Sequence, residues 1–229
     1  MKTNTLMKWF VAGSVAIGTF GTVKADSMSY TNSVSGLVDW TKQLGLTQFD
    51  PSWGDLQSVT ISLSASLNST FTITNTGGST YGVGSYAERS LDVYLGSSSI
   101  DQAVDAQNPN GSGNPWLTAY SARLSLNNLA PNASASGTRA GNASPLGASY
   151  TDNTTLGYFT GSGTAVLDLS TVSGFLMNLI NGSSYDSAQS TTASVIGIVT
   201  YNFTPIPEPS PFTLLGMGLL MLWPLIRKR

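Results

Sequence analysis

The chain contains no histidine and no cysteine, so its capacity for acid–base chemistry rests mainly on carboxylates. Asp101 and Asp105 lie four residues apart beside a long polar loop. Such a pair could serve a hydrolase that uses two acids, or a calcium ion, which prefers carboxylate and amide oxygens. The loop lacks the acids that an EF-hand needs at its first and last positions, where Ala106 and Leu117 stand. We therefore predict no cofactor, with calcium at Asp101 and Asp105 as an alternative.

Serine is abundant, but none of it stands in a nucleophile motif. No G-x-S-x-G turn is present, and no histidine could act as a base for a serine. The missing histidine and cysteine also exclude Cys/His zinc sites and thiol chemistry. The residue types therefore favour a non-enzymatic protein with no catalytic residues.

Aromatic residues in or near predicted turns are the second group that could bind a ligand. They are Trp40, Trp53, Trp116, Tyr120 and Tyr150. Carbohydrate-binding sandwiches often present aromatic rings on such loops. Trp53 and Trp116 are the candidate glycan contacts, and burial of these rings in the core is the alternative.

Alternating polar and apolar residues indicate the elements that must hold these side chains. In residues 58–67, SVTISLSASL, every second side chain is apolar and every other one carries a hydroxyl, which is typical of a strand with one wet face. Similar patterns occur at 70–74, 90–96, 122–129, 164–169 and 193–203. Residues 105–116 and 130–153 are rich in turn-forming residues, and 173–184 could be a short helix or a strand. We predict an all-β fold, a single antiparallel β-sandwich over residues 26–204.

The charges are distributed unevenly along the chain. Residues 26–206 hold four basic residues and eleven acidic ones, for a net charge of −7. Such a body repels phosphate backbones, so we expect no nucleic-acid partner.

The first 25 residues have the pattern of a secretory signal peptide. Lys2 and Lys8 are followed by an apolar stretch over residues 9–20 and by small residues before a cleavage site between Ala25 and Asp26. A buried N-terminal helix is the alternative. We expect export through the Sec translocon.

The last 25 residues, 205–229, end in a hydrophobic stretch and a basic cluster. Residues 212–226 carry no charge and would span about 22 Å as a helix, less than the ~30 Å hydrocarbon core. Alone, this stretch is either a marginal anchor or a core helix. Next to a signal peptide it predicts a single hydrophobic helix whose transfer is stopped by Arg227, Lys228 and Arg229 on the cytoplasmic side.

Pro207, Glu208 and Pro209, followed by that hydrophobic stretch and basic end, resemble the PEP-CTERM sorting signal of Gram-negative bacteria. The resemblance implies processing by an exosortase, a membrane protease that recognises the tripeptide. It also implies anchoring in the inner membrane before processing and delivery to the cell surface or the extracellular matrix.

The segment 49–79, FDPSWGDLQSVTISLSASLNSTFTITNTGGS, resembles the opening of the choice-of-anchor E domain, and residues 158–174 and 191–203 resemble its end. That family has no established activity, so the resemblance implies no catalytic residues. We therefore expect an exported, structural surface or matrix protein. A module that binds carbohydrate in extracellular polysaccharide or biofilm is the alternative.

Overall fold

A computed structural model describes residues 25–206, except for the side chains of Tyr120 and Ser121. Its elements follow one another in the order β1 (Asp26–Leu37), β2 (Thr41–Thr47), η1 (Pro51–Trp53), β3 (Gly54–Asn75), β4 (Tyr86–Leu95), α1 (Ser99–Asp105), β5 (Leu117–Ser125), β6 (Ser134–Tyr150), α2 (Asn153–Tyr158), β7 (Thr164–Asn178) and β8 (Tyr185–Pro205). The expected signal peptide, apart from Ala25, and the sorting tail beyond Ile206 lie outside the described residues.

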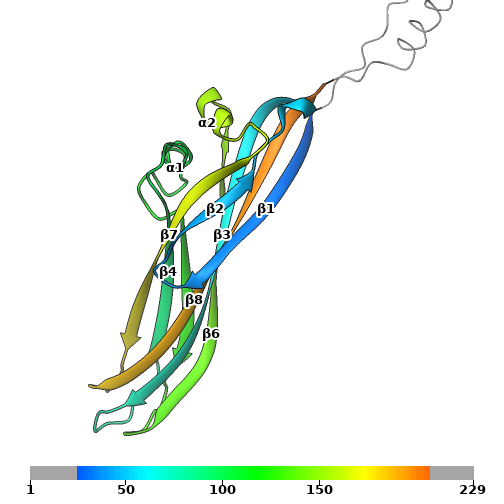
Figure 1. The fold of residues 1–229 in the computed structure, drawn as a ribbon. Coiled ribbons are helices and arrows are strands. Elements are labelled where there is room, and N and C mark those ends of the chain that lie inside the picture. Colours follow the sequence, from blue (N-terminus) through cyan, green and yellow to red (C-terminus); the bar gives the residue numbers. More distant parts are fainter. Residues whose placement is uncertain (1–24, 207–229) are drawn as a thin grey trace, which may run out of the picture.

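The strands form two antiparallel sheets that pack face to face (Figure 1). Sheet A has the order β1-β8-β3-β6, and sheet B has the order β5-β4-β7-β2. A single bridge between Tyr120 and Asn142 joins β5 to β6 at one side of the sandwich. The predicted all-β class and antiparallel β-sandwich are confirmed.

The long strands β3 and β8 form the centre of sheet A. Their ladder runs from the Gly54–Pro205 pair to the Asn75–Tyr185 pair. Along β3 the side chains from Val59 to Ile73 alternate between buried and more exposed positions, as the sequence predicts. The 22 residues of β3 would extend about 70 Å if fully extended, so the molecule is long and narrow (Figure 1).

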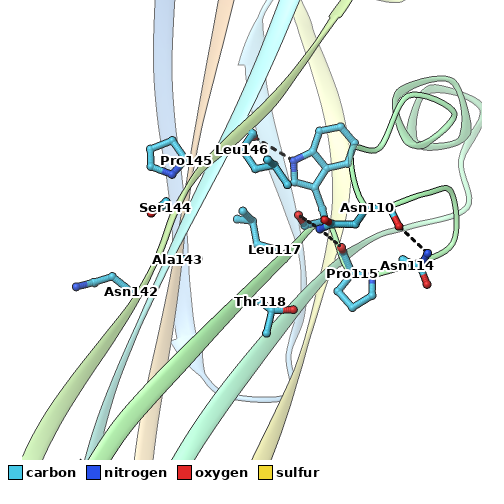
Figure 2. Close-up of a pocket in the computed structure, with 11 residues that line it drawn as sticks. Asn110, Asn114, Pro115, Leu117, Thr118, Asn142, Ala143, Ser144, Pro145 and Leu146 are labelled. Carbon is cyan, nitrogen blue, oxygen red and sulfur yellow. Dashed lines mark hydrogen bonds between the residues drawn. The ribbon is translucent and has the colours of Figure 1, made fainter.

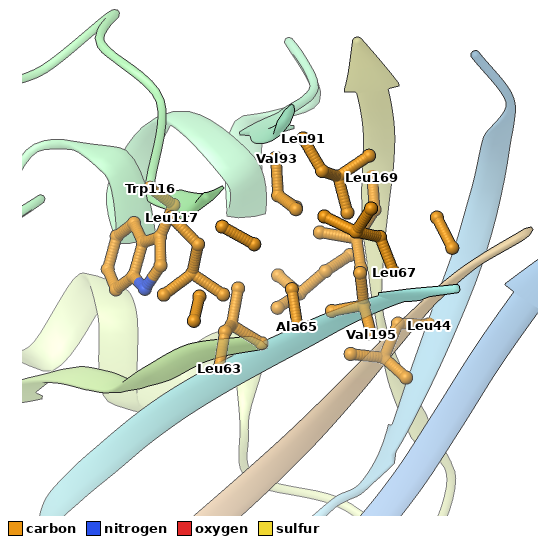
Figure 3. Close-up of a cluster of buried hydrophobic side chains, with 14 of the residues drawn as sticks. Leu44, Leu63, Ala65, Leu67, Leu91, Val93, Trp116, Leu117, Leu169 and Val195 are labelled. Carbon is orange, nitrogen blue, oxygen red and sulfur yellow. The ribbon is translucent and has the colours of Figure 1, made fainter. Parts of the chain in front are cut away.

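Side chains from the inner faces of both sheets fill the space between them (Figure 3). In the labelled cluster, Leu63, Ala65, Leu67 and Val195 project from sheet A, and Leu44, Leu91, Val93, Leu117 and Leu169 project from sheet B. Each large aliphatic side chain that is fully buried stabilises the fold by about 1.5–3 kcal/mol. The core therefore explains why both sheets place their apolar side chains inwards.

The structure corrects one expectation about secondary structure and decides another. Residues 134–150, predicted as part of a turn-rich stretch, form the 17-residue strand β6, because β3 pairs with it from Thr74–Ser134 to Val59–Tyr150. For residues 173–184, which could have been a short helix or a strand, the strand is confirmed as far as Asn178, where β7 ends beside β4.

A polar network joins four elements where β1 ends and β2 begins. The Asp39 carboxylate, in the connection between these strands, accepts hydrogen bonds from the backbone N–H and the hydroxyl of Ser173 on β7. Arg89 of β4 donates to the Ser173 hydroxyl and to the Gln189 side chain of β8, over 3.0 and 2.9 Å. The network links the two sheets and covers part of the β7 edge, which would otherwise offer unpaired backbone groups.

Candidate functional site

The two ends of the described chain meet at one tip of the sandwich (Figure 1). Asp26, the first residue of β1, pairs with Phe203 of β8, while Pro205 at the end of β8 pairs with Gly54. Ile206 donates its backbone N–H to the carbonyl of Trp53 over 3.3 Å. The chain therefore enters and leaves the body at the same place.

The turn before β3 completes this tip. The Asp50 carboxylate accepts the backbone N–H of Ser52, which lowers the pKa of Asp50, and Pro51 begins the short helix η1. Gly54 has φ of 155°, and a Cβ there would collide with the carbonyl of Thr204. Asp50, Pro51 and Gly54 thus build the turn that leads into β3.

The described part of the chain ends just before the sorting residues. Pro207, Glu208 and Pro209 and the basic residues Arg227, Lys228 and Arg229 lie outside the described residues. Of the expected cleavage site, Ala25 precedes the first strand and Asp26 begins it. Between residues 25 and 206, no helix is long and apolar enough to cross a membrane.

The aromatic candidates separate into one exposed ring and several buried ones. Trp53 is 40% exposed at the tip, where its ring meets the edge of Phe49 with 6.0 Å between centroids. Trp116, by contrast, is fully buried, so its ring is not exposed as a glycan contact would require, and the alternative of burial in the core applies to it. Trp40 and Tyr150 are buried as well, which agrees with the alternative that these rings belong to the core.

An open cleft lies between the loop after α1 and β6 (Figure 2). The buried Trp116 is one of the residues around it. Its indole N–H donates to the carbonyl of Leu146 over 3.2 Å. The cleft has a volume of about 890 Å³. Its polar lining comes from Asn110, Asn114, Thr118, Asn142 and Ser144. Amides and hydroxyls can both donate and accept, so this lining could bind an uncharged polar ligand.

The carboxylate of Asp101 stabilises the start of α1 from a buried position. It accepts the backbone N–H and the hydroxyl of Ser98 and, from β7, the backbone N–H of Asp168. Burial raises the pKa of the Asp101 carboxyl. These contacts give Asp101 a capping role, which favours helix formation.

Asp105, at the other end of α1, organises the loop that follows. Its carboxylate accepts hydrogen bonds from Asn108, from the hydroxyl of Ser112 and from the backbone N–H of Gly113. Within residues 25–206 there is no group of three acidic, histidine or cysteine side chains that could hold a metal. Both acids of the predicted pair are therefore engaged in local structure.

On the outer face of sheet A, polar side chains of four strands lie next to one another. The sequence indicates the polar side of a single strand but not which strands are neighbours. We call this surface the hydroxyl face. Its outward positions are Ser29, Thr31, Ser33, Ser35 and Leu37 on β1; Ala188, Ser190, Thr192, Ser194, Ile196, Ile198 and Thr200 on β8; Thr60, Ser62, Ser64, Ser66, Asn68, Thr70 and Thr72 on β3; and Ser136, Thr138, Ala140, Asn142, Gly147 and Ser149 on β6.

Hydroxyls on neighbouring strands of this face bond to each other. Ser29 meets Thr200 at 2.7 Å, and Thr60 meets Ser149 at 2.7 Å. These pairs fix the side chains in rows that cross the strands. The wet side predicted for residues 58–67 is thus confirmed and extends over four strands.

Comparisons with known proteins leave the family open. No protein-family model matches the chain, and no curated protein is a significant match to it. Solved structures with a weak similarity to this chain include that of infectious bursal disease virus Gx strain, with 10% identity over 88% of this chain and 49% of that chain and a TM-score of 0.21. A mud crab tombus-like virus structure has 12% identity over 95% of this chain and 92% of that chain, with a TM-score of 0.19. Arcelin-5 from Phaseolus vulgaris has 10% identity over 79% of this chain and 99% of that chain, also with a TM-score of 0.19. Scores this low support no conclusion about function.

Proposed function

We propose that the protein is an exported, non-enzymatic component of a bacterial cell surface or extracellular matrix, sorted and processed by an exosortase through its C-terminal tail. The observation that carries the proposal is the tip. Asp26 and Pro205 leave the body side by side, and Pro207, Glu208 and Pro209 follow β8 directly in the sequence. A long sandwich attached at one tip projects its other end away from the membrane.

The polar surface of the body supports the same proposal. The outer side of sheet A is mostly covered by small hydroxyl-bearing side chains, while the acids of the strongest candidate catalytic pair serve α1 and its loop. A surface of this kind suits contact with other polar, uncharged surfaces in a matrix. The proposed route is export through the Sec translocon, anchoring in the inner membrane and then release to the cell surface.

Expression of the full chain with and without an exosortase tests the sorting step. With the protease, we expect mass spectrometry to find a C-terminus shortened within the tail, and we expect Glu208→Gln to block this shortening. Asp55→Asn, which changes an exposed acid at the same tip, is the matched control and should be processed normally. An uncut chain that remains in the cytoplasm of both strains would refute the proposal.

The cleft of Figure 2 favours a second candidate function, the binding of carbohydrate in extracellular polysaccharide. Its amides and hydroxyls match the hydrogen-bonding groups of a neutral sugar. Pull-down with a neutral polysaccharide should weaken in Asn142→Ala, which changes the lining, and persist in Trp53→Ala, which changes the distant tip. Binding that depends on Trp53 and not on Asn142 would place the ligand at the tip instead.

A further inference from the structure

The hydroxyl face has no charged side chain anywhere in its central area. Its rows run from Ser29–Thr200–Thr60–Ser149 at one end to Ala188–Thr72–Ser136 at the other. The positions given above are all uncharged, and the acids Asp186 and Asp55 lie on the same side of sheet A only beyond the two ends of this face. Designed soluble proteins aim for a surface that is roughly 25–35% charged, so an uncharged face of four strands indicates a surface used for contact.

The charge of the body limits what this face can contact. Residues 26–206 carry a net charge of −7, so two copies of the protein repel each other in most orientations. Across the area between Asp186 at one end and Asp55 at the other, however, no like charges would meet. The face is therefore a surface through which two copies can approach closely.

Two isoleucines lie in the middle of this polar surface. Ile196 and Ile198 are 41% and 37% exposed on β8, which has β1 on one side and β3 on the other. Their neighbours in the rows are hydroxyl-bearing, namely Ser33 and Ser64 beside Ile196 and Thr31 and Ser62 beside Ile198. An apolar centre with a polar surround is the usual anatomy of a protein–protein interface.

A hollow lies next to the isoleucines on the same face. It has a volume of about 300 Å³ and is lined by residues of β1, β8 and β3, including Ser35, Leu37, Ser66, Thr192 and Ser194. Ser194 is two positions before Ile196, so the hollow and the projecting side chains are adjacent rows of one surface. The face thus contains both a projection and a depression.

We propose that the hydroxyl face binds a second copy of the chain. The twofold axis lies in the plane of the face, runs across the strands and crosses β8 near Val195. This axis places Ile196 of each copy over Ser194 of the other, and Ile198 over Thr192 beside Leu37. Each copy then fills the hollow of the other, as a self-complementary interface requires.

The area of the face is sufficient for such a dimer. Four strands at ~4.8 Å spacing give a width of about 19 Å over the eight steps from Thr60 to Asn68, a length of about 27 Å, and β8, β3 and β6 continue for four more steps, about 14 Å long and about 14 Å wide. The sum is roughly 700 Å², within the ~600–1,000 Å² that each partner buries in a specific interface of standard size.

Single cysteines provide the test, because the natural chain has none. The full chain is purified in mild detergent and treated with a short bismaleimide cross-linker. We expect Ser194→Cys and Ile196→Cys to give cross-linked dimers, since both positions lie near the axis. Thr72→Cys lies on the same face far from the axis, and Val172→Cys is an exposed position on β7 of sheet B. Both controls should stay monomeric on denaturing gels.

Sedimentation gives an independent readout. Ile198→Lys should raise the dimer dissociation constant at least about tenfold, whereas Val172→Lys should leave it unchanged. The proposal is overturned if neither face position cross-links, if the controls cross-link equally well, or if the unaltered chain is monomeric at high concentration. Neither readout involves export or processing, so failure of the sorting proposal would not affect it.

Discussion

Removing the phenolic hydroxyls of Tyr150 and Tyr201 should make the protein more resistant to alkaline unfolding. Both side chains are fully buried, and both donate hydrogen bonds of 2.7 Å, Tyr150 to the carbonyl of Val104 and Tyr201 to that of Thr47. Burial is the main cause that raises the pKa of both phenols. A tyrosine whose pKa is higher in the folded state than its unfolded value of about 10 contributes its full stability below pH 10 and loses it as the pH rises further.

The magnitude follows from proton linkage. Above pH 10 each buried tyrosine should lower the free energy of unfolding by about 1.4 kcal/mol per pH unit, so the two together should lower it by roughly 2.8 kcal/mol at pH 11. Tyr201→Phe loses a hydrogen bond and leaves the Thr47 carbonyl unpaired, which costs about 1–3 kcal/mol at neutral pH. That deficit should shrink by about 1.4 kcal/mol between pH 8 and pH 11.

Urea unfolding followed by tryptophan fluorescence at several pH values measures this deficit directly. For Tyr150→Phe, the difference in free energy of unfolding from the unaltered protein should shrink by the same amount as the pH rises. In the double variant it should shrink by about twice as much as in either single variant. A deficit that stays constant from pH 8 to pH 11 would show that these phenols do not control alkaline stability.

Further substitutions test the tip and the core by chemical denaturation. Gly54→Ala should destabilise the protein by at least about 2 kcal/mol because its Cβ would strike the carbonyl of Thr204, whereas Gly78→Ala, where a Cβ meets nothing within 4 Å, should change stability by less than about 1 kcal/mol. Trp116→Ala should cost about 3–5 kcal/mol, and Trp53→Ala, at a partly exposed ring, clearly less. Equal losses within either pair would contradict the burial and the backbone geometry described above.

Sequence patterns were most informative where a strand is amphipathic along its whole length. In β3 the alternation from Val59 to Ile73 identifies the strand and its buried side, because successive side chains of a strand point to opposite faces. The turn from Asp50 to Gly54 was also predictable, since its residues have strong local conformational preferences.

The strand β6 was not predictable in this way. Residues 134–150 are mostly serine, glycine, alanine and asparagine, which resemble a loop in composition. They form a strand because β3, about 60 to 90 residues earlier, offers backbone partners along nearly its whole length. Pairing over such a separation leaves no local signal.

For the candidate sites too, local sequence did not predict which side chains are buried, as the two tryptophans show. Both Trp53 and Trp116 lie in stretches rich in turn-forming residues, yet one is 40% exposed and the other is buried. Trp116 stands just before β5, and its indole reaches the carbonyl of Leu146 on β6. Burial depends on which segments pack over a side chain, and neighbours in the sequence do not reveal that.

The hydroxyl face combines both kinds of information. Period-2 alternation in the local sequence specifies that Ser and Thr occupy one side of β3, because that side must be polar if the other fills a core. Whether such stripes lie together depends on strand order and register. Pairing of β1, β8, β3 and β6 aligns four stripes from distant parts of the chain and sets Ile196 and Ile198 among them. Backbone hydrogen bonds between strands impose that alignment, and they form only in the folded sheet.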